Sequence, residues 1–115
     1  MSIQRHEPTP ILSNAVEHGN TVYLAGIVAD DPSADVKGQT QQILKRIDAL
    51  LATCGSDKTK LLSAQIWLTD IGNRPAMNEA WSAWVDPKNL PVRACVESRL
   101  ADPRLLVEIM VIAAK

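Results

Sequence analysis

The chain has 115 residues, of which 46% are hydrophobic and 22% charged, with a formal net charge of -1. This length allows one domain with a buried core, spanning residues 1–115, and leaves no room for a second. Acidic and basic residues are mixed along the chain, and no apolar run approaches the roughly 20 residues of a membrane span. We therefore expect no nucleic-acid and no membrane partner.

The two cysteines, Cys54 and Cys95, do not have the spacing of metal ligands, and the two histidines, His6 and His18, lie far from both in sequence. The sequence therefore predicts no metal site, and both histidines are expected in turns or on the surface. The first ten residues lack the apolar core of an export signal. Free thiols without such a signal predict a cytoplasmic protein.

Two short strands are expected over residues 3–7 and 13–17. The turn "HGNT" follows, and the alternating segment "TVYLAGIVA" predicts a third strand over residues 21–29. From about residue 36 the period becomes helical, and Gly55 stands where a helix C-cap is expected. The apolar stripe that predicts this first helix consists of Ile43, Ile47, Leu50, Leu51 and Cys54.

Alternation returns in "KLLSAQIWLTD", which predicts a fourth strand. Asn73 and Pro75 mark the start of a second helix, which ends before Pro87. Two final strands are expected over residues 92–98 and 105–113. The order β-β-β-α-β-α-β-β predicts an α+β domain in which both helices cover one face of a mixed sheet.

Strand alternation divides the sheet residues into two sets. We expect the apolar set to lie under the helices: Val22, Leu24, Leu62, Ala64, Ile66, Leu68, Val92, Ala94, Val96, Val107, Ile109 and Val111. The uncovered face should then carry Arg93, Cys95, Glu97 and Glu108, with Tyr23, Ala25, Ser63, Gln65 and Trp67. Such a face is too apolar for water and too polar for a core, which favours self-association with polar pockets between subunits.

Arg93, in "NLPVRACVES", is the candidate binding residue. A guanidinium matches a carboxylate bidentately and stays charged, so Arg93 is suited to hold a small anion, with Glu108 as partner or orienting group. One alternative is a structural ion pair of Arg93 with Glu108 or Glu97 in a subunit interface. Cys95 is expected to form pocket wall, since no histidine lies nearby in sequence to activate it.

The pattern "PVRACVES…DPRLLVEIMVIAA" resembles the Rid family of RidA/YjgF-like enamine/imine deaminases, as do "GNTVYLAG", "LSAQIWLTD" and "MNEAWSAWV". The shorter N-terminus and the Trp-rich second helix are similar to the small YoaB-like branch. The resemblance implies a chorismate-mutase-like fold of the bacillus type, with a six-stranded sheet. It also implies a homotrimer with a central barrel and ligand clefts between subunits.

The activity that the resemblance implies is hydrolysis of reactive 2-imino or enamine acids to 2-keto acids and ammonia, without metal or cofactor, as a form of metabolite damage control. Arg93 would bind the substrate carboxylate, and Glu108 would place or polarise the attacking water. The cleft would also be lined by Cys95, Asn78, Trp81, Ala25 and Tyr23.

Two departures from the family pattern leave an alternative open. Ala25 stands where archetypal members carry a serine, and their tyrosine has no counterpart among Leu12, Ser13 and Asn14. A trimer that binds small carboxylates or a protein partner without turnover is therefore the second hypothesis.

Overall fold

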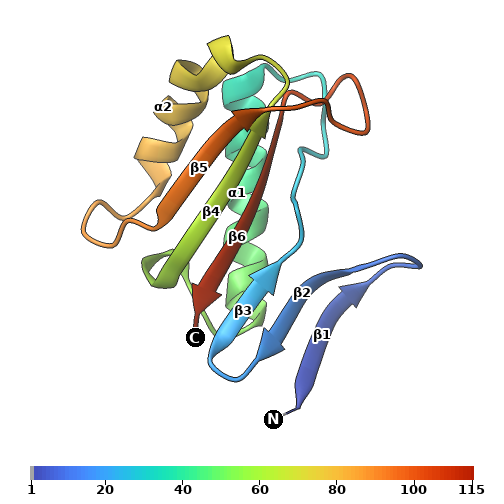
Figure 1. Ribbon diagram of the computed structural model, residues 1–115, viewed down its shortest axis with the longest axis vertical. Helices are drawn as coiled ribbons and strands as arrows, with labels where there is room; N and C mark the ends of the chain where they lie inside the picture. The colour runs from blue at the N-terminus through green and yellow to red at the C-terminus, as the bar shows by residue number, and fades with distance from the viewer. Residues whose placement is uncertain (1) are drawn as a thin grey trace.

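The computed structural model describes residues 2–115, which form one six-stranded sheet with two helices (Figure 1). The predicted order of elements is confirmed. The strands are β1 (Ile3–Pro8), β2 (Ser13–His18), β3 (Thr21–Leu24), β4 (Leu61–Leu68), β5 (Val92–Glu97) and β6 (Val107–Ala114). The helices are α1 (Val36–Thr53) and α2 (Arg74–Trp84), and two short 3-10 turns, η1 (Lys58–Lys60) and η2 (Ile71–Asn73), precede β4 and α2.

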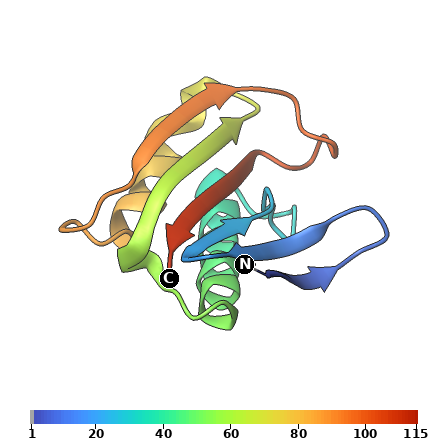
Figure 2. The ribbon, with the colours of Figure 1, turned by 60° about the horizontal axis from the view of Figure 1, so that its bottom comes forward.

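The strand order across the sheet is β1-β2-β3-β6-β4-β5. Only β4 and β5 run parallel, because α2 crosses between them, and the other neighbours are antiparallel. Both helices lie against the same face of the sheet (Figures 1 and 2). The mixed sheet with one helix-covered face is therefore as the sequence predicts. Strand β3 is shorter than expected, because after Leu24 the chain keeps only an isolated bridge between Ile27 and Ile109.

Helix α1 forms for the reasons visible in its sequence. The Asp35 side chain accepts a hydrogen bond from the Gly38 backbone N–H at 2.8 Å, which caps the first turn. Gly55 follows the last turn with φ of +74°, a conformation that glycine adopts without strain. The predicted stripe is buried against the sheet: Ile43, Ile47, Leu50, Leu51 and Cys54.

The predicted helix-facing residues of β3 and β6, and three of the four in β4, are buried as expected: Val22, Leu24, Ala64, Ile66, Leu68, Val107, Ile109 and Val111. The prediction for Leu62 is wrong. An irregularity in the register between Leu61 and Ser63 turns Leu61 into the core and leaves Leu62 49% exposed.

The prediction for β5 is wrong as well. The parallel register pairs Ala64 with Arg93 and Ile66 with Cys95, and paired residues share a face of the sheet. Arg93, Cys95 and Glu97 therefore lie on the helix-covered face. Val92, Ala94 and Val96 lie on the uncovered face, where Val92 is 73% exposed.

Glu108 lies on the uncovered face, because it pairs with Trp67. Within one chain, Arg93 and Glu108 are thus on opposite faces of the sheet, contrary to the expectation that they share one. The physical reason is that alternation shows which residues of a strand point the same way, but not which way that is. The apolar set of an edge strand turns outward here.

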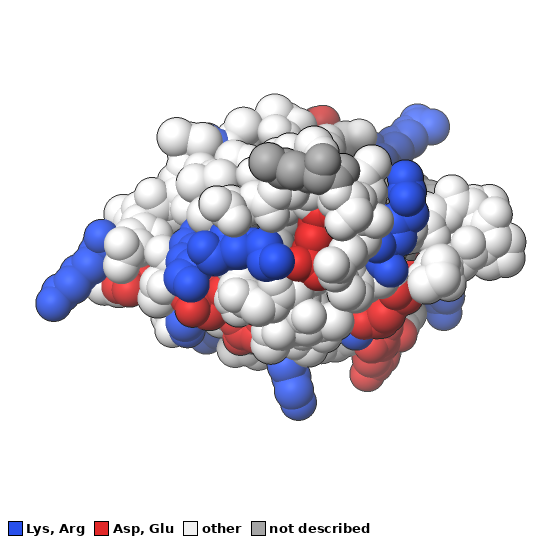
Figure 3. All heavy atoms as spheres, turned by 90° about the horizontal axis from the view of Figure 1, so that it is seen from below, with Lys and Arg blue, Asp and Glu red and all other residues white. Residues whose placement is uncertain are grey.

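Basic and acidic side chains are interspersed over the end of the molecule that carries both termini (Figure 3). Within residues 2–115, no helix combines the length and the apolar character that crossing a bilayer requires.

Candidate functional site

Arg93 sits on the edge strand β5 and is held by one side of helix α2. Its Nη1 donates a hydrogen bond to Oδ1 of Asn78 at 2.8 Å. Its Cζ lies 5.4 Å from the ring centroid of Trp81, which stacks a cation on an aromatic ring. Asn78 and Trp81 are three residues apart on α2 and so lie on one helical face. The sequence prediction placed these three residues in one site, and the structure brings them together.

The charge of Arg93 is not balanced within the chain. Among residues 2–115, no carboxylate lies within ion-pair distance of its guanidinium. Burial lowers the pKa of Arg93, the nearby charge of Arg74 acts in the same direction, and Cys95 opposes them. A guanidinium nevertheless stays protonated in proteins. Arg93 is therefore a half-buried cation with an amide and an aromatic ring beside it, which is a suitable position for an anion.

Neither Glu97 nor Glu108 reaches Arg93 within one chain, so the ion pair expected as an alternative could form only between chains. Glu97 accepts a hydrogen bond from the Ile71 backbone N–H at 3.0 Å. Glu108 lies on the other face of the sheet. An ion pair of Arg93 with either residue is therefore absent from the described part of a single chain.

Cys95 lies two residues beyond Arg93 on the same face and packs, partly buried, against the hydrophobic core. Both histidines of the chain are in β1 and β2, at the opposite side of the sheet from β5. No imidazole is placed to take a proton from this thiol. Cys95 is therefore placed to form part of the wall of the site, which is the role that the sequence predicts.

Glu108 occupies a second polar position, on the uncovered face. Its side chain is half-buried beside Gly26, where a Cβ atom would overlap the Glu108 carboxylate. Burial raises the pKa of Glu108, and no cation lies within ion-pair distance among residues 2–115. Sequence reasoning missed the role of Gly26; its signal was a glycine just after the end of a strand.

Tyr23 lies on the same uncovered face as Glu108, whereas Ala25, just past the end of β3, packs partly buried against the hydrophobic core. Tyr23 pairs with Ile112 across β3 and β6 and is largely exposed. The Ala25 backbone N–H donates to the Asn14 carbonyl at 3.0 Å. A shallow hollow of about 580 Å³ extends over this face, lined by Ser63, Gln65, Trp67, Val92, Met110 and Ile112 among others. The Arg93 guanidinium itself is held on the other face, against α2.

The predicted site residues therefore form two groups in one chain. Arg93, Cys95, Asn78 and Trp81 are on the helix-covered face at β5, and Glu108 and Tyr23 are on the uncovered face. Ala25 lies just past β3 and packs against the core. A separate set of potential metal ligands, His6, Glu17 and Cys54, lies near the β1–β2 edge of the sheet.

Comparison with known proteins gives one family. The family model described as Endoribonuclease L-PSP matches residues 3–115. A RutC family protein of Haemophilus influenzae is 44% identical over 114 residues, covering 98% of this chain and 98% of the relative. The RutC family protein YoaB of Escherichia coli is 41% identical over 114 residues, covering 99% of each.

Solved structures agree with this result. The structure of a YjgF family member from Neisseria meningitidis superimposes with a TM-score of 0.97 at 43% identity, covering 100% of this chain and 96% of that one. A member of the conserved Rid family from Yersinia pestis has a TM-score of 0.92 at 28% identity, covering 99% and 100%. A more distant relative in Acinetobacter baylyi, 30% identical over 105 residues that cover 86% of this chain and 82% of the relative, is named 3-aminoacrylate deaminase RutC.

Proposed function

This chain belongs to the Endoribonuclease L-PSP family, the family of the RutC, YjgF and Rid proteins, and we propose that it hydrolyses reactive 2-imino or enamine acids. The relative named 3-aminoacrylate deaminase supports this reaction class, because 3-aminoacrylate is itself an enamine acid. The products are a 2-keto or 3-oxo acid and ammonia.

The observation that carries the proposal is the unbalanced charge of Arg93. A half-buried guanidinium without a carboxylate partner in the described chain is costly to maintain, and a bound carboxylate removes that cost. Asn78 and Trp81 hold one amino group and one face of the guanidinium, which leaves the remaining donors for the substrate carboxylate.

The second half of the site comes from another copy of the chain in this proposal. Glu108 is an unbalanced anion on the uncovered face, and Arg93 is an unbalanced cation on the edge strand β5. One chain keeps the two apart, so they can face one cleft only across an interface. The uncovered face also exposes Val92, Val96, Met110 and Tyr23, which favours its burial against other copies in a homotrimer.

The proposed hydrolysis requires only a few protein groups. Arg93 fixes the acid, and Glu108 orients a water toward the electrophilic imine carbon and accepts a proton from it. The raised pKa of Glu108 makes its carboxylate a better proton acceptor than a solvated one. The carbon–oxygen bond forms, the nitrogen takes up a proton, and the carbon–nitrogen bond breaks to release ammonia. Positioning of this kind can lower a barrier by about 7–11 kcal/mol at best.

A second candidate is a carboxylate-binding protein without turnover. Ala25 favours it, because a methyl group at this position offers no hydroxyl to a substrate. In this case Arg93 still binds the anion, but nothing accelerates hydrolysis.

An amino-acid oxidase that forms imino acids in the cuvette provides the test, with the rate of keto-acid formation as the readout. The wild-type protein should accelerate hydrolysis, and Arg93→Ala should slow it at least about tenfold, since a charge-assisted hydrogen bond contributes about 1.5–3 kcal/mol. Arg5→Ala, an exposed change on the opposite edge strand, is the control and should match the wild type.

Failure of the wild type on every imino acid tested, or an Arg93→Ala variant as fast as the wild type, would contradict the deaminase proposal. Thermal stabilisation by a small carboxylate without any turnover would favour the binding protein instead, provided that Arg93→Ala abolishes the stabilisation.

A further inference from the structure

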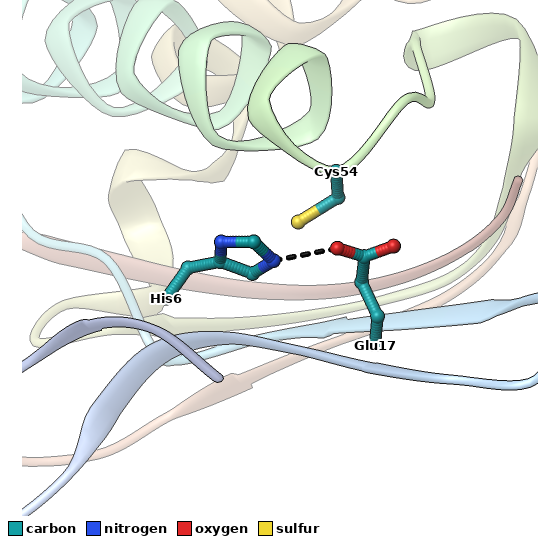
Figure 4. A group of neighbouring side chains, drawn as sticks. All are labelled: His6, Glu17 and Cys54. Atoms are coloured by element: carbon teal, nitrogen blue, oxygen red, sulfur yellow. Dashed lines mark hydrogen bonds and ion pairs between the residues drawn. The ribbon is translucent and has the colours of Figure 1, made fainter. Parts of the chain in front are cut away.

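Three side chains with metal-binding atoms converge near the β1–β2 edge of the sheet (Figure 4). His6 comes from β1, Glu17 from β2 and Cys54 from the C-cap of α1. His6 Nε2 lies 2.5 Å from Glu17 Oε2, and one donor atom from each of the three residues falls within 4.8 Å of the others. The grouping is independent of the Arg93 site, which is on the opposite edge strand.

The fold explains how residues so distant in sequence meet. His6 pairs with Ala15 in the β1–β2 ladder, so His6 and Glu17 are diagonal neighbours on the helix-covered face. The last turn of α1 lies over this part of the sheet and places Cys54 above both (Figure 4). The sequence spacing argued against a metal site, because it could not show this contact.

We propose that His6, Glu17 and Cys54 bind one zinc-type divalent ion. An imidazole nitrogen, a carboxylate oxygen and a thiolate sulfur are the donors that zinc accepts in tetrahedral sites, whereas magnesium and calcium select oxygen ligands. Three protein ligands leave the fourth position for water.

The surroundings of Glu17 fit this role. Lys115 Nζ lies 2.7 Å from Glu17 Oε1, so it occupies the oxygen that His6 does not contact. With Oε2 directed at the ion, Lys115 would hold the carboxylate in place from outside, as outer partners of metal ligands do. Glu17 and Cys54 are both buried, so an ion bound between them would be largely shielded from water.

Ion binding displaces protons in this arrangement. Cys54 is a free, buried cysteine, and it would bind the ion as a thiolate. Binding forms the metal–sulfur bond and releases the thiol proton. It also replaces the His6–Glu17 hydrogen bond by two metal bonds, and the Nε2 proton of that hydrogen bond moves to Nδ1 of a neutral imidazole or leaves to solvent from an imidazolium.

An ion must reach the three side chains from the surface, and the distance between His6 and Glu17 must widen slightly to bind it. A hollow of about 300 Å³ reaches Glu17 from the surface, lined by Ser2, Gln4, Glu17, Gly19 and Lys115. The His6–Glu17 distance must open from 2.5 Å to about 3.3 Å to admit metal bonds of about 2.0–2.1 Å at a tetrahedral angle. His6 is partly exposed on an edge strand, which makes this movement possible. The ion would then tie the β1–β2 hairpin to the end of α1.

Cobalt(II) titration of the reduced, metal-free protein tests the proposal, because a thiolate bound to cobalt(II) gives a sulfur-to-metal band in the near ultraviolet. The wild type should bind one cobalt ion per chain with this band, and zinc should displace it. Cys54→Ser should abolish the band, and Cys95→Ser, the matched control at the other cysteine, should retain it. His6→Gln should weaken binding by at least about tenfold, an effect that even outer-shell substitutions produce.

Absence of the band in folded wild-type protein would overturn the proposal, as would a band that survives Cys54→Ser or disappears with Cys95→Ser. Far-UV circular dichroism establishes that each variant is folded. If Cys54→Ser does not fold, His6→Gln decides the question, since unchanged cobalt affinity in that variant contradicts the site. Cys54→Ser and His6→Gln should leave imino-acid hydrolysis unchanged, because both residues lie at the sheet edge opposite Arg93. Failure of the metal proposal therefore leaves the proposed function untouched.

Discussion

Arg93 and Glu108 share a physical situation, although they point to opposite faces of the sheet. Each is half-buried, and each lacks an opposite charge within the described chain. Burial of an unpaired charge destabilises a protein, and a ligand or another chain that supplies the opposite charge removes that cost. This shared situation, more than the identity of either residue, indicates a site between copies.

Glu108 gives a prediction about pH. Its pKa is raised by burial, and a proton acceptor works only when ionised, so activity should fall as the pH drops through a value above the ordinary glutamate pKa of about 4.3. Glu108→Gln should lower kcat by about 10²-fold or more with little effect on KM, and should remove this acid limb. The measurement is the pH profile of kcat/KM. An acid limb that persists in Glu108→Gln would assign it to another group.

At the scale of elements, the sequence predicted most of the fold, because periodicity is a local property. The stripe from Ile43 to Cys54 and the alternation in β6 each identify one element without knowledge of the rest. Periodicity does not show which face of the sheet the apolar residues of β5 occupy. Val92, Ala94 and Val96 are the more apolar set, but the helix-covered side of this edge strand is occupied by Asn78 and Trp81, which accept Arg93.

The contacts of His6 and the role of Gly26 were also out of reach, for a related reason. His6 meets Cys54 only through the combination of the β1–β2 register and the position of α1. Gly26 matters because Glu108, far along the chain, lies against it. Contacts between distant segments depend on the assembled fold and leave no periodic signal.

The end of α1 depends on Gly55. Its φ of +74° costs a residue with a Cβ atom about 1–2 kcal/mol, although nothing within 4 Å would collide with that atom. Gly55→Ala should therefore lower the free energy of unfolding by about 1–2 kcal/mol in urea denaturation. The exposed substitution Lys45→Ala in the same helix should change it by less than about 0.5 kcal/mol. Equal effects of the two variants would show that the helix end carries no backbone strain.

For the molecule as a whole, the uncovered face of the sheet is the surface with exposed apolar residues that burial against other copies would cover. Met110 is exposed on it, pairs with Gln65 on β4, and lines the same hollow as Gln65. If this face is buried between copies, Met110→Asp places a charge in an apolar interface and should dissociate the trimer into chains of 12.5 kDa. Multi-angle light scattering measures the mass.

Met110→Asp should keep its circular dichroism spectrum, because the side chain is outside the core of the single chain. Lys45→Glu, an exposed change on the helical side, is the control and should remain trimeric. A wild-type protein that is monomeric at all concentrations, or a Met110→Asp variant that stays trimeric, would contradict burial of the uncovered face between copies.

Subunit mixing tests most directly whether one site takes Arg93 from one chain and Glu108 from another. Arg93→Ala should be at least about tenfold slower than the wild type, and Glu108→Gln about 10²-fold slower or more. After denaturation and refolding together in equal amounts, half of the chains carry each intact residue, so about one quarter of the sites should regain both in a cyclic trimer. Recovery of about one quarter of the wild-type imino-acid hydrolysis is the predicted result. A mixed trimer no more active than the separate variants would contradict a site shared between two chains.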